Sequence, residues 1–124
     1  MEKLILIAIA GAAGTVSRYE LAGLVQRLYG GTFPFGTAFV NVTGSFLFGF
    51  IWALAEERLV ISGETRAIIL TGFMGAFTTF STFMFETSGL MRDTQWIAGF
   101  ANLALQIILG LACMVLGMAA GRLI

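Results

Sequence analysis

Four long apolar stretches, separated by short polar connectors, dominate this sequence. They cover approximately residues 4–28, 35–55, 67–91 and 96–120. A helix that crosses a bilayer needs roughly 20 consecutive, mostly apolar residues, and each stretch reaches that length. The sequence therefore predicts an all-α integral membrane protein in which residues 1–124 form a single domain of four transmembrane helices.

The composition agrees with insertion into lipid. Hydrophobic residues make up 58% of the chain, which carries seven basic and seven acidic side chains. A soluble domain is usually about 25% charged, and a chain this short has little interior in which to bury apolar surface. The chain has no histidine, the commonest metal ligand and proton shuttle. The lone Cys113 excludes an internal disulfide, and the zero net charge argues against a nucleic-acid partner.

The cations are nearly balanced between the two sides of the membrane. One side would hold both termini, the second connector and four cations: Lys3, Arg58, Arg66 and Arg122. The other side would hold two or three cations: Arg27, Arg92 and, if it lies near that interface, Arg18. Because a bias in such residues sets orientation, this weak bias allows insertion both ways. An antiparallel homodimer is then one alternative, and a single orientation with a modest bias is the other.

The third stretch is the least regular of the four. Between Thr71 and Glu86 it is crowded with glycine and hydroxyl residues: Gly72, Gly75, Thr78, Thr79, Ser81 and Thr82. Glycine is a poor helix former, and hydroxyl side chains can bond nearby backbone groups. A helix broken here at mid-membrane depth would free backbone groups that often bind ions. The alternative is an unbroken helix whose hydroxyls bond back to its own carbonyls.

Three further side chains are candidates for an ion path. Phe80 and Phe83 lie three residues apart and share one helical face. The positive edge of an aromatic ring can attract a small anion without a full charge; packing in the core or against lipid is the competing interpretation. Asn41 lies inside the second stretch, where a buried amide must find partners or line a wet path. A hydrogen bond between helices is its competing role.

Arg18 and Glu86 are ionisable residues inside predicted helices. Such residues are costly in a bilayer and indicate functional sites. A purely structural ion pair of Arg18 with Glu20 or Glu86 is equally compatible with the sequence.

At these positions the chain resembles the bacterial Fluc-type (CrcB-type) fluoride channels over nearly its whole length. The first stretch carries Gly11-x-x-Gly14-x-x-x-Arg18-Tyr19. The second carries Gly36-Thr37-x-x-x-Asn41-x-x-Gly44. The most specific part is the third, with Thr71-Gly72-x-x-Gly75-x-x-Thr78-Thr79-Phe80-Ser81-Thr82-Phe83-x-x-Glu86.

The resemblance implies a dual-topology antiparallel homodimer with two pores, each built from both subunits. It implies passive fluoride export across the bacterial cytoplasmic (inner) membrane, which confers fluoride resistance. The residues expected along the fluoride pore are Phe80, Phe83, Asn41, Ser81 and Thr82. The polar groups expected near the pore vestibule are Thr37, Glu86 and Arg18.

The resemblance also implies one structural Na⁺ at the dimer interface, held by the backbone carbonyls of Gly75 and Thr78. Two carbonyls from each subunit would suit a hard cation that prefers oxygen ligands. A cation there would also make the dimer centre positive, which helps to attract anions. No role follows for Asn102 and Gln106, the polar residues of the fourth stretch.

Two other classes of protein are alternatives to a fluoride channel. A small four-helix, proton-coupled multidrug exporter could exchange protons at Glu20 or Glu86, but it would have no use for the Thr-Thr-Phe-Ser-Thr-Phe run. A non-transporting scaffold would need the polar residues of the third stretch only for folding. An enzyme is not expected, because the chain shows neither a nucleophile–base pair nor the spacing of metal ligands.

Overall fold

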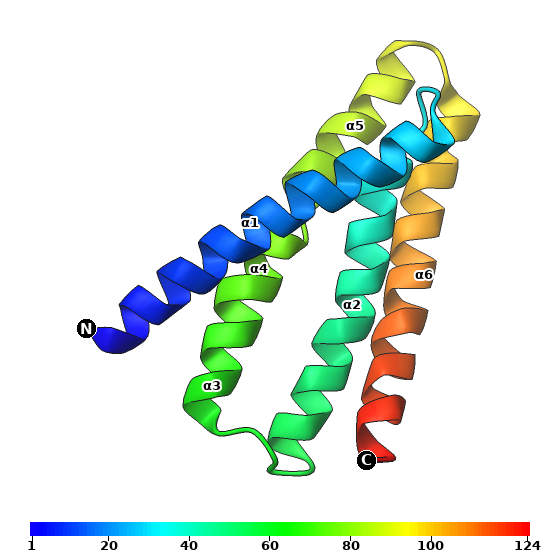
Figure 1. The fold of residues 1–124 in the computed structure, drawn as a ribbon. Coiled ribbons are helices and arrows are strands. Elements are labelled where there is room, and N and C mark those ends of the chain that lie inside the picture. Colours follow the sequence, from blue (N-terminus) through cyan, green and yellow to red (C-terminus); the bar gives the residue numbers. More distant parts are fainter.

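Four helical stretches make up the computed structural model, which describes residues 1–124 (Figure 1). They are α1 (Glu2–Tyr29), α2 (Phe35–Glu56), a segmented third stretch over Gly63–Arg92, and α6 (Trp96–Arg122). All four are long and apolar enough to cross a membrane. This confirms the predicted all-α fold with four candidate membrane spans.

Local chemistry sets where the helices begin and end. Gly30 and Gly31 have φ angles of 66° and 74°, which glycine adopts readily, and they allow the turn that ends α1. The third stretch starts at Gly63, four residues before the predicted start at residue 67. Its extra turn forms because the Ser62 hydroxyl caps it, accepting the Thr65 N–H at 3.2 Å.

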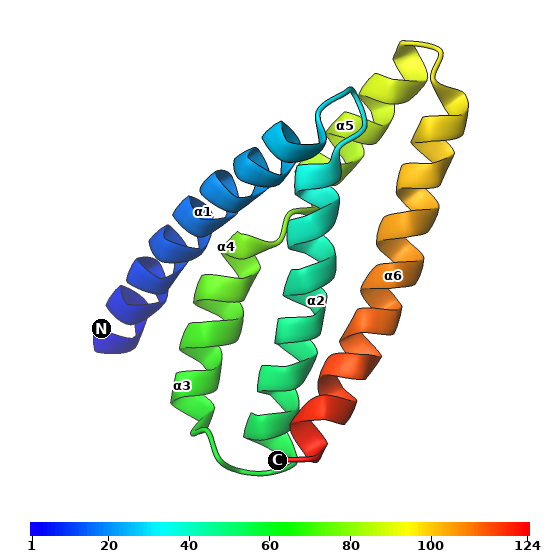
Figure 2. The same ribbon diagram turned by 45° about the vertical axis from the view of Figure 1, so that its right-hand side comes forward.

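Helices α2 and α6 lie side by side, while α1 crosses the bundle at a steep angle (Figures 1 and 2). Small residues permit this close approach. A Cβ atom at Gly117 of α6 would overlap the Phe46 carbonyl of α2. Because no hydrophobic force drives helices together in lipid, such backbone proximity is a main source of their association.

Charged side chains gather where α2 and α6 end. Arg122 pairs with Glu57, with 2.5 Å between Nε and Oε2, and Arg66 pairs with Glu56. The hydrogen bonds from Arg122 hold the pKa of the Glu57 carboxyl below its usual range. Arg58 also donates to the Ile124 carbonyl at 2.9 Å. Three of the cations predicted to share one side therefore do lie at one end of the bundle.

The third stretch is divided into four helical segments. α3 (Gly63–Ala67) leads into the π-helix η1 (Ile68–Met74) and the short α4 (Gly75–Phe77), and α5 (Phe80–Arg92) follows. Between α4 and α5, Thr78 and Thr79 are extended, with φ/ψ of −93°/157° and −148°/115°. The chain thus stops being helical at these two residues and starts again in a new direction (Figure 2).

The buried core lies next to this interruption. Val40 of α2 packs with Leu70, Met74 and Phe77, which belong to η1 and α4. Val40 and Met74 are essentially inaccessible to solvent. The segment before the interruption is therefore fixed against α2, which allows α2 side chains to reach the extended residues.

Candidate functional site

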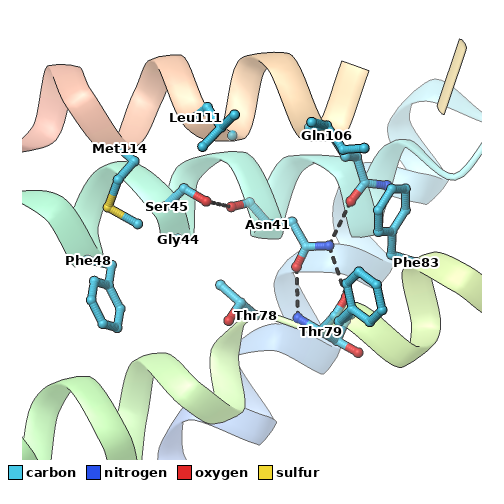
Figure 3. A pocket seen from close by; sticks show the side chains of 13 residues that line it. Asn41, Gly44, Ser45, Phe48, Thr78, Thr79, Phe83, Gln106, Leu111 and Met114 are labelled. Atoms are coloured by element: carbon cyan, nitrogen blue, oxygen red, sulfur yellow. Dashed lines mark hydrogen bonds between the residues drawn. The ribbon is translucent and has the colours of Figure 1, made fainter. Parts of the chain in front are cut away.

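The Asn41 side chain of α2 binds both backbone groups of Thr79. Its Oδ1 accepts the Thr79 N–H at 2.8 Å, and its Nδ2 donates to the Thr79 carbonyl at 3.0 Å (Figure 3). Extended backbone inside a helical bundle has polar groups that need partners. One amide supplies both, so the structure explains how Thr79 can leave the helix.

The interruption changes the hydrogen-bond partners of the Gly75 and Thr78 carbonyls, among others. In a continuous helix the Thr79 N–H would donate to the Gly75 carbonyl, and the Thr82 N–H to the Thr78 carbonyl. Instead, the Thr79 N–H binds Asn41, and the Thr82 N–H binds Oγ1 of Thr79 at 3.2 Å. The carbonyls of Gly75 and Thr78 are consequently left without their helical donors.

Arg18 of α1 binds the backbone of α4. Its Nε donates to the Ala76 carbonyl at 2.9 Å, close to the C-terminal end of that segment. A cation is stabilised at a helix C-terminus by the orphan carbonyls there. The two ion pairs of the structure are Arg66–Glu56 and Arg122–Glu57, so the suggested pairing of Arg18 with Glu20 or Glu86 is not formed.

A groove of about 450 Å³ opens beside Asn41, and we call it the central groove. α2, the interruption, α5 and α6 all contribute to its walls. No lining side chain is charged, and the lining residues are Asn41, Gly44, Ser45, Phe48, Thr78, Thr79, Phe80, Phe83, Gln106, Ile107, Gly110, Leu111 and Met114.

Phe80 and Phe83 stand edge to face at this groove. Their ring centroids are 6.0 Å apart, and the ring planes meet at 80°. Phe83 is 5% exposed, whereas Phe80 is 74% exposed. One ring is therefore fixed inside the bundle, and the other projects from it, free to meet a further surface.

A second space, of about 400 Å³, lies between α1, α2 and α5, and we call it the side hollow. Thr37, Thr82, Glu86 and Arg18 line it, and so does Thr79, which also borders the central groove. The Thr37 hydroxyl donates to Oε1 of Glu86 at 2.9 Å. The other carboxylate oxygen, Oε2, is buried and has no hydrogen-bond partner.

The predicted site residues thus divide into three sets. Asn41, Phe80, Phe83 and Thr78 meet at the central groove. Thr37, Thr82, Glu86 and Arg18 meet at the side hollow. Ser81 and Gly75 border neither space and are exposed on the bundle surface.

Gln106 of α6 is a groove residue to which the sequence assigned no role. Its Oε1 accepts from Nδ2 of Asn41 at 2.7 Å, and its Nε2 donates to Oδ1 of Asn102 at 2.9 Å. Both residues are buried, Gln106 at 6% and Asn102 at 0% exposure. The available signal was two amides four residues apart, and hence on one face, in an otherwise apolar helix.

Comparison with known proteins gives a consistent picture. The sequence profile of the family described as CrcB-like protein, Camphor Resistance (CrcB), matches residues 5–118. A protein from Nitrosococcus oceani is 59% identical over 123 residues, which are 99% of this chain and 98% of that protein. One from Solidesulfovibrio magneticus is 56% identical over 124 residues, or 100% and 99% of the two chains. Both relatives are named fluoride-specific ion channel FluC.

A more distant relative carries the same name. The protein from Sorangium cellulosum is 43% identical over 122 residues, which are 98% of this chain and 96% of that protein. The shared name describes a channel, in agreement with the expectation that the chain is not an enzyme, and it gives no support to a proton-coupled exporter.

Proposed function

The chain belongs to the CrcB-like protein family, and we propose that it is a fluoride-selective ion channel of the bacterial cytoplasmic membrane. It exports fluoride passively and so relieves fluoride toxicity. The observation that carries this proposal is the similarity to proteins named fluoride-specific ion channels, 59% and 56% identical across essentially the whole chain. Measurement of fluoride release from liposomes that contain the purified protein tests it directly.

The central groove has suitable chemistry for the conduction of fluoride. Fluoride is small and strongly hydrated, so a pore must replace its water with other donors and still release it. Asn41 offers an amide, and the edges of Phe80 and Phe83 offer positive partial charge. Because no cationic side chain lines the groove, an anion there meets no full positive charge, which would hold it too tightly to conduct.

The interruption at Thr78 and Thr79 is proposed to lie near the middle of the membrane. Its place along the third stretch supports this depth: residues 63–77 precede it, and residues 80–92 follow it. Extended backbone is tolerated there only where protein or a water-filled space surrounds it. Asn41 and the two spaces that border Thr79 provide those surroundings.

The working unit is proposed to be an antiparallel homodimer with two pores. The central groove is open, and its Phe80 ring is 74% exposed, so a second protomer would supply the wall that one chain lacks. Arg18 binds beside the interruption, so the two ends of the bundle hold four cations and two cations, a weak bias that permits insertion in both orientations. An isologous interface with its two-fold axis in the membrane plane follows from that arrangement.

One structural Na⁺ is proposed at the centre of this dimer. The donor groups fit such an ion, since the carbonyls of Gly75 and Thr78 have lost their helical donors. Gly75 is exposed on the protomer, so a second protomer can approach this residue. Uncharged oxygen ligands suit a hard monovalent cation, and Na⁺ would add positive charge near the pores.

A further inference from the structure

A chain of hydrogen bonds runs in one direction from Asn41 across α6 to α5. Asn41 donates to Gln106 at 2.7 Å, Gln106 donates to Asn102 at 2.9 Å, and Asn102 donates to Oγ1 of Thr87 at 2.8 Å. The Thr87 hydroxyl then donates to the Phe83 carbonyl at 2.7 Å. This series of hydrogen bonds has a backbone group at each end. One end is Thr79, whose N–H and carbonyl bind Asn41, and the other is the Phe83 carbonyl.

The backbone groups at the two ends of this hydrogen-bond series fix the orientation of every side-chain amide between them. The Thr79 N–H can only donate, so Oδ1 of Asn41 faces it, and Nδ2 faces the Thr79 carbonyl and Gln106. At the other end, the Phe83 carbonyl can only accept. Gln106 is therefore held with its carbonyl oxygen toward Asn41, which lines the groove (Figure 3), and with its nitrogen toward Asn102.

The orientation of the Gln106 amide is unexpected beside an anion path, because its carbonyl oxygen, and not its N–H group, faces Asn41. Asn41 has two amide hydrogens, and the protein already uses both, one on Thr79 and one on Gln106. A fluoride ion at Asn41 must therefore replace one acceptor. The Thr79 bond belongs to a pair that holds the interruption, whereas the Gln106 bond reaches a single side chain on the groove wall.

We propose that Gln106, held by Asn102, is a positioning residue that competes with fluoride for the Asn41 amide. Its carbonyl oxygen occupies the Asn41 N–H until an ion displaces it, and it takes the N–H back when the ion leaves. A conducting site must bind the ion weakly enough to release it, and this competition limits the affinity. The inference rests on the proposed function of fluoride conduction.

The test compares Gln106→Met with the wild type in planar bilayers, with current recorded as a function of fluoride concentration. Methionine is similar in volume and cannot accept this hydrogen bond strongly, so Asn41 is left with a free N–H. The half-saturating fluoride concentration should fall by about fivefold, the ratio that corresponds to the net free energy of one hydrogen bond. The maximal current should fall as well, because the ion leaves more slowly.

A second variant guards against poor folding of the first. Asn102→Leu removes the acceptor that holds the Gln106 nitrogen, so Gln106 can rotate and stop occupying Asn41. The half-saturating concentration should fall here too. The control is Thr43→Val, because the Thr43 hydroxyl bonds only the Phe39 carbonyl of its own helix, at 2.6 Å. Its half-saturating concentration and maximal current should match the wild type.

The half-saturating fluoride concentration and the maximal current together distinguish the possible outcomes. A lower half-saturating concentration in the variants, and not in the control, supports the competition. A purely structural role of the amides would lower the maximal current without lowering the half-saturating concentration, and that result overturns the proposal. An increase would make Gln106 a ligand of fluoride and overturns it equally. If the wild type itself carries no fluoride current, the proposed function fails, and this inference fails with it.

Discussion

Asn41 of α2 holds Thr79 by both of its backbone groups, accepting from the N–H at 2.8 Å and donating to the carbonyl at 3.0 Å. The Asn41 side chain thereby replaces the backbone hydrogen bonds that Thr79 would make in a continuous helix. Thr79 in turn uses its hydroxyl to cap α5 through the Thr82 N–H. The two contacts link the end of one helical segment to the start of the next, and Thr79 borders both the central groove and the side hollow.

The first prediction concerns this contact. Asn41→Leu keeps a similar shape but leaves both backbone groups of Thr79 without partners, so the protein should lose stability. A buried unsatisfied group costs about 1–3 kcal/mol, and a lower thermal midpoint of the protein in detergent would report the loss. Fluoride flux in liposomes should also fall sharply. Thr43→Val should change neither quantity, and an unchanged midpoint in Asn41→Leu would show that Asn41 does not hold the interruption.

The second prediction concerns the aromatic edges. Phe80→Ile and Phe83→Ile keep apolar volume but remove the ring quadrupole, so fluoride flux should fall at least tenfold, which corresponds to about 1.4 kcal/mol on the barrier. Phe83→Ile should also lower the thermal midpoint, because Phe83 is 5% exposed, whereas Phe80 is 74% exposed in the protomer.

Phe85→Ile is the matched control for this pair. Phe85 lies in the same helix and is 68% exposed, and it borders neither the central groove nor the side hollow. Its flux should stay near the wild-type value. Unchanged flux in folded Phe80→Ile and Phe83→Ile variants would mean that the two rings only pack, and that hydroxyl and amide groups alone carry the ion.

The sequence predicts the helices better than it predicts the site. Four apolar runs suffice for the helices because a bilayer demands length and apolarity, and both can be read along a chain. The irregular third stretch also follows from its glycine and hydroxyl residues. The hydrogen-bond partners of individual side chains do not follow from the sequence. Arg18 binds the Ala76 carbonyl and forms no ion pair, because the end of α4 leaves a carbonyl free to accept, and no sequence motif predicts where α4 ends.

The fourth helix marks the limit of sequence reasoning most clearly. Gln106 borders the central groove, and so does Phe48 of α2, which lies outside every motif. Their positions depend on how α2 and α6 pack, and that packing is set by backbone contact at small residues such as Gly117. The π-helix η1, which supplies Leu70 and Met74 to the core, is likewise not predicted by any pattern in the sequence.

The third prediction concerns orientation in the membrane. Val60 lies in the loop between α2 and α3 and is 70% exposed. A Val60→Cys substitution in a Cys113→Ser background should react with an impermeant thiol reagent from both sides of the membrane. The weak cation bias is the physical reason. Labelling from one side only would contradict an antiparallel dimer formed from this chain.

The fourth prediction concerns the proposed Na⁺. Replacing sodium with a large organic cation over many hours should lower the thermal midpoint and the fraction of dimer, because a ligand stabilises the state that binds it. The loss would reach about 2.7 kcal/mol if sodium had been present at about 100 times its dissociation constant. Returning sodium should restore both quantities. Full stability and dimerisation after prolonged exchange would contradict the site.

Selective fluoride conduction is the central claim, and one flux measurement tests it most directly. Liposomes that contain the purified protein are loaded with potassium fluoride or potassium chloride and diluted into a buffer whose anion is large and impermeant, and a potassium ionophore then balances the charge. Passive, electrogenic conduction predicts rapid fluoride release that needs the ionophore and no proton gradient, while chloride stays inside. Equal release of chloride, or fluoride release only when a proton gradient is imposed, would contradict the account.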